Sequence, residues 1–297
     1  MQLDMTKGRP MPIILKFFVP IFIGNMFQQF YNMVDSIIVG RYVGEEAFAA
    51  VGSTGTIMFL VLGFANGLST GFTVLTSQKF GAKDEKGIRQ SVSNAIILSV
   101  IVSVVMTIIS VLSMGALLHL MNTPKNIYHY AYDYIIIITG GTAAVCFYNL
   151  FSALLRAVGN SKAPLFFLIL SAVLNIFLDL LFIIRFRWEV QGAAIATIAS
   201  QAISAVCCLF YILAKVKILV PHRDEWKING HYAKKQLAVG FPMALQFGIT
   251  ASGTLIMQSA INRFGSTAIA GFNASSKVGN LLTQAFPALG QSMDTYA

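Results

Sequence analysis

Long apolar stretches recur along this chain, separated by short polar ones, and this pattern limits the fold more than any other feature. Eight of these stretches are long enough, as helices, to cross the ~30 Å hydrocarbon core of a bilayer. They are residues 13–40, 47–76, 90–121, 128–153, 163–185, 190–215, 234–262 and 267–297. Charged residues make up 11% of the 297 residues, against ~25% in soluble domains, and 56% are hydrophobic. The sequence therefore predicts an all-α membrane protein, built as a polytopic helical bundle.

The Lys and Arg residues are divided unevenly between the two sets of loops. Fifteen lie in the amino-terminal tail and in the connections after the second, fourth and sixth predicted helices, whereas five lie in the other connections. Because basic residues concentrate on the cytoplasmic side, the amino terminus is predicted to be cytoplasmic. The net charge of +9 is spread over these loops without the clustering of a nucleic-acid face, which argues against nucleic acid as a partner. The three Cys and four His residues lack metal-ligand spacing.

Two carboxylates fall inside the apolar stretches at matching depth. Asp35 precedes Arg41 by six residues, and Asp179 precedes Arg185 by six. At ~1.5 Å per helical residue, each acid lies ~9 Å in from the same membrane face. An ionised carboxylate at such depth is costly, and membrane proteins that keep one use it for ions, protons or substrates. These two acids are the strongest functional signal in the sequence.

Other polar residues accompany the two acids. Asn175 lies one helical turn before Asp179 on the same face, and Thr197 lies ~12 Å in from Glu189, close to the depth of the acids. We expect the side chains of Asp35, Asn175, Asp179 and Thr197 to share one polar pocket. Its hard oxygen atoms suit a proton or Na⁺. The structural alternatives are an Asp paired with a Lys or with backbone, and polar contacts that hold helices together.

Three further polar residues lie inside the predicted helices. Gln28 lies two turns before Asp35, and Asn149 lies two turns before Arg156, so both are candidates for lining a central cavity. Helix–helix hydrogen bonding explains these two amides equally well. Lys277, inside the last apolar stretch, is expected to extend its ammonium to the membrane surface or to pair with a residue beyond this chain.

The segment from residue 237 onward repeats the start of the chain at an offset of about 222. The matching pairs are Leu15 and Leu237, Pro20 and Pro242, Arg41 and Arg263, and, after a one-residue gap, Gly44 and Gly265, Ala47 and Ala268, and Ala49 and Ala270. Six helices per copy is an even number, so the copies are parallel. We expect residues 1–220 to form a six-helix lobe. Residues 221–297 then hold a linker and the first two helices of a second lobe, which the chain leaves incomplete.

In order and spacing, several motifs resemble the multidrug and toxic compound extrusion (MATE) transporters, a family of twelve-helix exporters with two six-helix lobes. The matching stretches are residues 31–52, 77–82, 155–162, 174–183 and 191–194. The resemblance implies that about eight of twelve transmembrane helices are present. It also implies that Asp35, Asn175, Asp179 and Thr197 build a coupling-cation site. Gln28 and Asn149 would correspond to polar residues of the drug cavity.

The resemblance implies an antiporter rather than an enzyme. It would be driven by H⁺ or Na⁺ and would export amphiphilic, often cationic, drugs and toxic organic compounds. It would lie in the plasma membrane of a prokaryote among membrane lipids, need no cofactor, and be monomeric when full length. One alternative is a flippase for lipid-linked oligosaccharides, which should carry several basic residues in its cavity, where Lys277 is the only candidate. A remote alternative is an intramembrane aspartyl protease that uses Asp35 and Asp179, although both lack a Gly-x-Gly-Asp environment.

Overall fold

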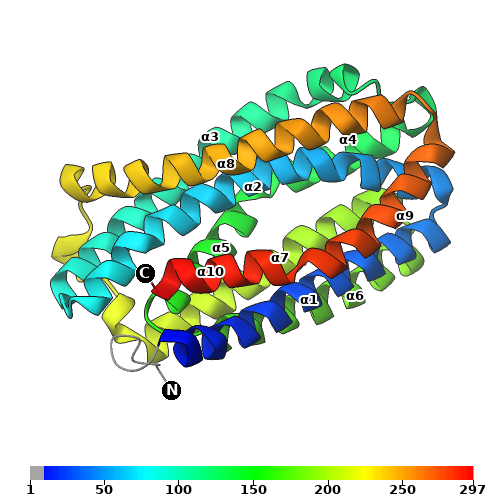
Figure 1. Ribbon diagram of the computed structural model, residues 1–297. Helices are drawn as coiled ribbons and strands as arrows, with labels where there is room; N and C mark the ends of the chain where they lie inside the picture. The colour runs from blue at the N-terminus through cyan, green and yellow to red at the C-terminus, as the bar shows by residue number, and fades with distance from the viewer. Residues whose placement is uncertain (1–9, 297) are drawn as a thin grey trace.

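Long helices running up and down a common axis account for nearly all of this computed structural model, which describes residues 10–296 (Figure 1). In chain order the helices are α1 Pro10–Tyr42, α2 Glu45–Gly81, α3 Glu85–Leu120, α4 Lys125–Gly140, α5 Thr142–Ala157, α6 Lys162–Asp179, α7 Glu189–Lys215, α8 Gly230–Asn262, α9 Ser266–Thr283 and α10 Ala285–Tyr296. No strand occurs among the described residues. The predicted all-α helical bundle is therefore confirmed.

Three of the eight predicted stretches are interrupted. Helices α4 and α5 meet at Gly141 with a bend of 49°, where two consecutive glycines weaken the helix. Helix α6 gives way to a π-helical turn, Leu180–Arg185, directly after Asp179. The last stretch is split into α9 and α10 at Gln284. Sequence periodicity does not reveal these breaks.

Within residues 10–296, five helices are long and apolar enough to cross a membrane, and α4 with α5 makes a sixth if the bent pair is one span. The five are α2, α3, α6 together with its π-helical turn, α7 and α8. Helices α1 and α9 are long as well, but each has a row of polar side chains that lines a cavity between the helices. These rows reduce the hydropathy of two segments that the sequence predicts to be spans.

Two apolar clusters hold helices α1 to α7 together. One surrounds buried side chains such as Ile57, Ile127 and Ile135, and the other surrounds Phe72 and Leu154. In water, burial of such a side chain stabilises a fold by about 1.5–3 kcal/mol. Within lipid, the stabilisation comes from close packing of the side chains. These clusters form the core on which the last three helices are placed.

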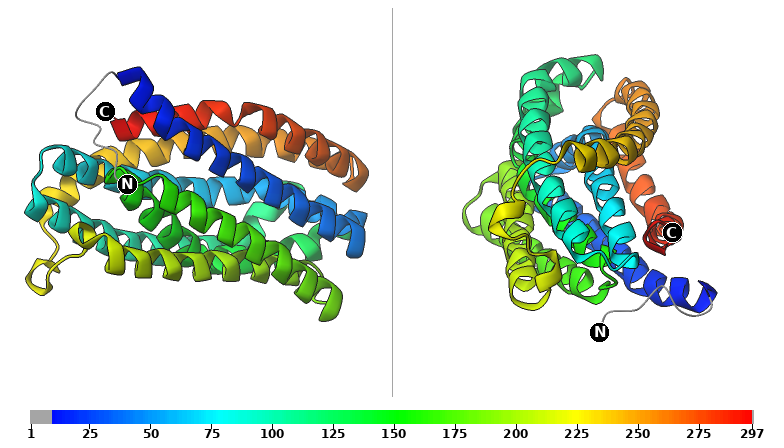
Figure 2. Two further views of the ribbon diagram at one scale, coloured as in Figure 1. Left: turned by 90° about the horizontal axis from the view of Figure 1, so that it is seen from below. Right: turned by 90° about the vertical axis from the view of Figure 1, so that its left-hand side faces the viewer.

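Helix α8 lies along α2 because glycines allow the two backbones to approach (Figure 1). A Cβ atom at Gly71 would overlap the backbone of Gly240, and one at Gly67 would lie 2.8 Å from the Cα atom of Ala244. Only small residues permit such contact between membrane helices. Helices α9 and α10 then run beside α1 (Figure 2). Their assignment to a second lobe stays a prediction.

The connection between α7 and α8 is fixed to α3. Arg89 Nε donates to both carboxylate oxygens of Glu225, at 3.0 and 3.1 Å, and Ser93 Oγ donates to the Glu225 carbonyl at 2.9 Å. The Asn229 backbone N–H donates to Asn94 Oδ1 at 2.9 Å. About two turns into α8, the buried Gln236 side chain donates to backbone carbonyls of α2 and α3. The start of α8 is thereby tied to the first half of the chain.

Candidate cation site and cavity

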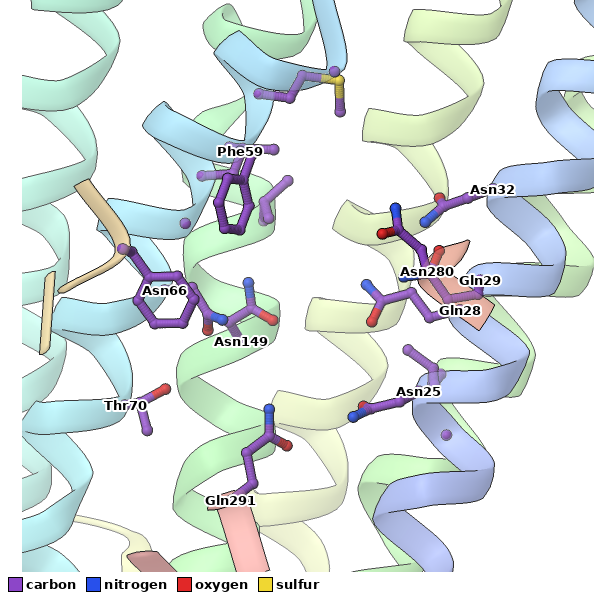
Figure 3. A pocket seen from close by; sticks show the side chains of 18 of the residues that line it. Asn25, Gln28, Gln29, Asn32, Phe59, Asn66, Thr70, Asn149, Asn280 and Gln291 are labelled. Carbon is purple, nitrogen blue, oxygen red and sulfur yellow. The ribbon is translucent and has the colours of Figure 1, made fainter. Parts of the chain in front are cut away.

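A cavity of about 790 Å³ lies between α1, α2, α5 and α6 on one side and α8, α9 and α10 on the other. Its wall is rich in carboxamide side chains, and Figure 3 shows those of α1 facing Asn66 of α2, with Asn149 of α5 between them. The labelled amides are Asn25, Gln28, Gln29, Asn32, Asn66, Asn149, Asn280 and Gln291. Among the described lining residues, Asp35, Arg156 and Lys277 are the charged ones. The wall is therefore polar but carries little charge.

The two predicted acids meet at one side of this cavity. Asp35 lies on α1 with 7% of its surface exposed and lines the cavity, whereas Asp179, at the end of α6, is fully buried. Their carboxyl groups lie close enough to interact electrostatically with each other. Two carboxylates in contact repel each other unless a proton or a cation lies with them. This pair therefore suits the binding of a single positive charge.

Asn175 and Thr197 complete the cluster around the acids. The Asn175 amide donates to Thr197 Oγ1 at 3.4 Å, a long hydrogen bond that joins α6 to α7. Four buried acceptor atoms of the cluster have no hydrogen-bond partner: Asp35 Oδ1, Asn175 Oδ1, and both carboxylate oxygens of Asp179. Buried acceptors without a partner are rare, because each loses its hydration without compensation. Their gathering at one point is what a proton or a small hard cation requires.

The structure places Asp35 near Asp179 and Asn175 beside Thr197, and of these four residues Asp35 alone lines the cavity. That the four share one pocket stays a prediction. Gln28 and Asn149 lie on the cavity wall, as expected for candidates of that kind. Gln28 also interacts with the Tyr31 side chain, three residues along the same helix. The roles of these six residues in binding stay predictions.

Sequence reasoning missed three residues of this neighbourhood. Tyr31 is buried one turn before Asp35, and its hydroxyl bonds to the side chains of Gln28 and Gln201. Tyr134 is buried within electrostatic range of both acids. The spacing of four residues between Tyr31 and Asp35, and between Thr197 and Gln201, was a usable signal. Nothing in the sequence distinguished Tyr134 from the other tyrosines of α4.

The expectation that the Lys277 ammonium extends to the membrane surface is wrong, because Lys277 lies on the cavity wall. Pairing with a residue beyond this chain stays a prediction. The Lys277 Nζ donates to the Asn32 carbonyl at 3.4 Å and interacts electrostatically with Asp35. Lys277 is also not the only basic residue there, since Arg156 lines the same cavity. Helix α9 turns its polar side chains toward α1, which the sequence alone did not show.

A family model described as MatE matches residues 20–181, which include Asp35, Asn175 and Asp179. The curated "Probable multidrug resistance protein YpnP" of Bacillus subtilis (strain 168) is 30% identical over 296 residues, which are 99% of this chain and 66% of the relative. The "Probable multidrug resistance protein NorM" of Thermotoga maritima is 28% identical over 289 residues, 94% of this chain and 60% of the relative. The chain spans less than two thirds of the length of both relatives.

A solved structure shares the fold. It is described as the "Outward-facing conformation of a multidrug resistance MATE family transporter of the MOP superfamily" and aligns with a TM-score of 0.86 at 24% identity. The alignment covers 99% of this chain and 66% of that chain. The arrangement of all described helices, including α8 to α10, is therefore one that occurs in known proteins.

Proposed function

The chain belongs to the MatE family, and we propose that it serves as a cation-coupled exporter of small organic compounds. The coupling ion is H⁺ or Na⁺, and the site for it is the cluster of Asp35, Asn175, Asp179 and Thr197. The observation that carries the proposal is the group of four buried, unpartnered acceptor oxygens around two adjoining carboxyl groups. One of these carboxyl groups, that of Asp35, lines the cavity, so a substrate in the cavity can approach it.

The cavity suits amphiphilic substrates. Its volume of about 790 Å³ lies within the ~300–1,000 Å³ common for small-molecule pockets. Amides of α1 provide hydrogen-bond donors and acceptors, while Phe59, Phe247 and Met257 supply apolar and polarisable surface. A cationic compound near Asp35 would compete with the coupling ion. Exchange then requires only that the ion and the compound prefer different conformations of the protein.

Loop charges support an orientation for this exchange. The connections 82–84, 158–161 and 216–229 lie at one end of the bundle, and the connections after α1, α3 and α8 lie at the other (Figure 1). The first end carries most of the Lys and Arg residues and would face the cytoplasm. The cation cluster then opens nearer the outer face of the plasma membrane. We expect the complete protein to function as a monomer among membrane lipids.

The flippase hypothesis keeps some support, because Arg156 and Lys277 both line the cavity and could bind a phosphate group. Uptake of a lipid-linked pyrophosphate sugar in vesicles would distinguish it from drug export. The protease hypothesis is excluded by the family, whose members are transporters and not enzymes. Two interacting Asp side chains are the one feature that the cluster shares with aspartyl proteases.

Replacement of Asp35 by Asn tests the proposal, since it keeps the size of the side chain and removes its charge. The purified wild-type chain should bind ethidium, a permanent aromatic cation, and Na⁺ or acid should weaken that binding. The Asp35→Asn protein should lose this sensitivity to the ion. Fluorescence titration at several Na⁺ concentrations and pH values measures both properties.

Asp133→Asn is the matched control, because Asp133 accepts from Gln191 at 2.9 Å outside the cluster. It should retain the wild-type ion sensitivity. Equal ion sensitivity in Asp35→Asn and wild type would refute the proposed coupling site.

A further inference from the structure

Lys277 is a cation that the described chain leaves without a close acid. It is half-buried on α9, with Nζ 3.4 Å from the carbonyl oxygen of Asn32. It takes part in none of the ion pairs within 4.0 Å found between residues 10 and 296. Asp35 is the acid with which it interacts electrostatically. The ammonium is thus held near this carboxylate without being bound to it.

The packing of α9 on α2 determines this position. Asn273, one turn before Lys277, fits over Gly52 so closely that a Cβ atom at position 52 would overlap its amide. Asn273 Nδ2 is buried and has no hydrogen-bond partner. The same face of α9 turns Asn280 toward the α1 amides Gln28 and Gln29 (Figure 3). Helix α9 is therefore held in a rotation about its axis that turns its polar face, which includes Lys277, toward the cavity.

We propose that Lys277 is a built-in counter-cation of Asp35, which makes the cavity prefer zwitterionic amphiphiles to purely cationic ones. The inference rests on the proposed function, in which Asp35 binds the coupling ion. A cationic compound that approaches Asp35 meets repulsion from the ammonium. When the coupling ion binds, the negative charge of the carboxyl pair falls by one, so the ammonium is less well compensated and attracts an anionic group of the substrate more strongly. A zwitterion with a carboxylate satisfies Lys277 and keeps its cationic part in the amide-lined wall.

Rhodamine B and rhodamine B ethyl ester form a suitable pair of probes. They share one aromatic body, but the first is a zwitterion with a free carboxylate and the second is a cation. In the wild-type chain, Na⁺ or acid should strengthen binding of rhodamine B and weaken binding of the ester. Responses of the same sign for both probes would overturn the inference, whatever the variants do.

Lys277→Met removes the ammonium while keeping a long side chain. It should raise the affinity for the ester and lower that for rhodamine B, so that the ratio of the two affinities changes by about tenfold or more. Lys277→Arg keeps the charge and should keep the wild-type ratio. Lys162→Met removes a charge from the exposed start of α6, outside the cavity, and serves as the matched control.

The Asp35→Asn protein separates failure of this inference from failure of the proposed function. If Asp35→Asn abolishes ion sensitivity while Lys277→Met leaves the ratio unchanged, the inference fails and the coupling site stands. If Lys277→Met changes the ratio while Asp35→Asn keeps its ion sensitivity, the coupling site fails and Lys277 remains a determinant of substrate charge. Thermal unfolding of each variant verifies folding, and Lys277→Gln replaces Lys277→Met if the latter does not fold.

Discussion

The helix pair α1–α2 and the pair α8–α9 follow the same local plan. Helices α1 and α8 each contain 33 residues and an internal proline, Pro20 and Pro242 respectively. A glycine with positive φ then starts the following helix, at 133° for Gly44 and 89° for Gly265. Such backbone angles favour glycine, because a Cβ atom would be strained there. Features that shape the backbone therefore recur in both pairs.

The chemistry of the two pairs differs. The repeat aligns Asp35 of α1 with Met257 of α8, and both line the cavity, but the acid is 7% exposed and the methionine 48%. It aligns Thr56 of α2 with Lys277 of α9, so the first pair provides the acid and the second pair the base. An internal repeat thus predicts the course of the backbone better than it predicts a binding site.

The first prediction tests the acid that distinguishes the first pair, Asp35, by replacing its neighbour Asp179 at the end of α6. Asp179→Asn leaves Asp35 without a second carboxylate, so the affinity for the coupling ion should fall by about 100-fold or more. Titration of the purified protein with Na⁺ or acid, with the displacement of bound ethidium as the readout, measures this affinity. Asp133→Asn should bind the ion as the wild type does. A wild-type ion affinity in Asp179→Asn would show that the two acids do not share one ion.

The second prediction concerns the contact that joins the two pairs. At Gly71→Ala the new methyl group meets the backbone of Gly240, so α2 and α8 must separate. The free energy of unfolding should fall by about 1–3 kcal/mol, measured by thermal unfolding in detergent. Gly253→Ala is the control on α8, since its Cβ atom would meet nothing within 4 Å. Equal stability of the two variants would contradict the close packing of the pairs.

The third and smallest prediction uses an acid outside the helices that span the membrane. Asp84 caps α3 by accepting from the Gly87 N–H at 2.9 Å and pairs with Lys79 at 2.7 Å. The Lys79 ammonium and then the Gly87 N–H hold the pKa of Asp84 below its ordinary value. Its stabilising contribution is therefore complete above the ordinary pKa and is lost as the pH falls through the lower value of the folded protein.

Asp84→Asn should accordingly have a slightly lower thermal stability than wild type near neutral pH, and the difference should vanish in acid. The effect is small because the group is exposed to solvent. Asp224→Asn, in the connection between α7 and α8, is the control. A stability difference that grows on acidification would contradict the lowered pKa of Asp84.

The sequence was sufficient for the helical class and for the depth of the acids. Counting from Arg41 and Arg185 put Asp35 and Asp179 at one level, and the two acids lie close together although the residues between Asp179 and Arg185 form a π-helical turn. The rotation of α9 was not accessible, because it depends on how Asn273 fits against Gly52. The same limit explains why Tyr134 was missed. The depth of a residue in the membrane follows from its position along one helix, whereas the direction in which its side chain points follows from packing between helices.

The anchoring of the α7–α8 connection has a mechanical consequence. The Arg89–Glu225 pair and the Gln236 amide fix the start of α8 to α2 and α3, so α8 cannot swing as a free arm about the preceding connection. Displacement of α9 against α1 is then taken up farther along the chain, at Gly265 between α8 and α9. The pivot for moving Lys277 relative to Asp35 thus lies at the far end of α8, next to the cation cluster, rather than in the long connection between the halves.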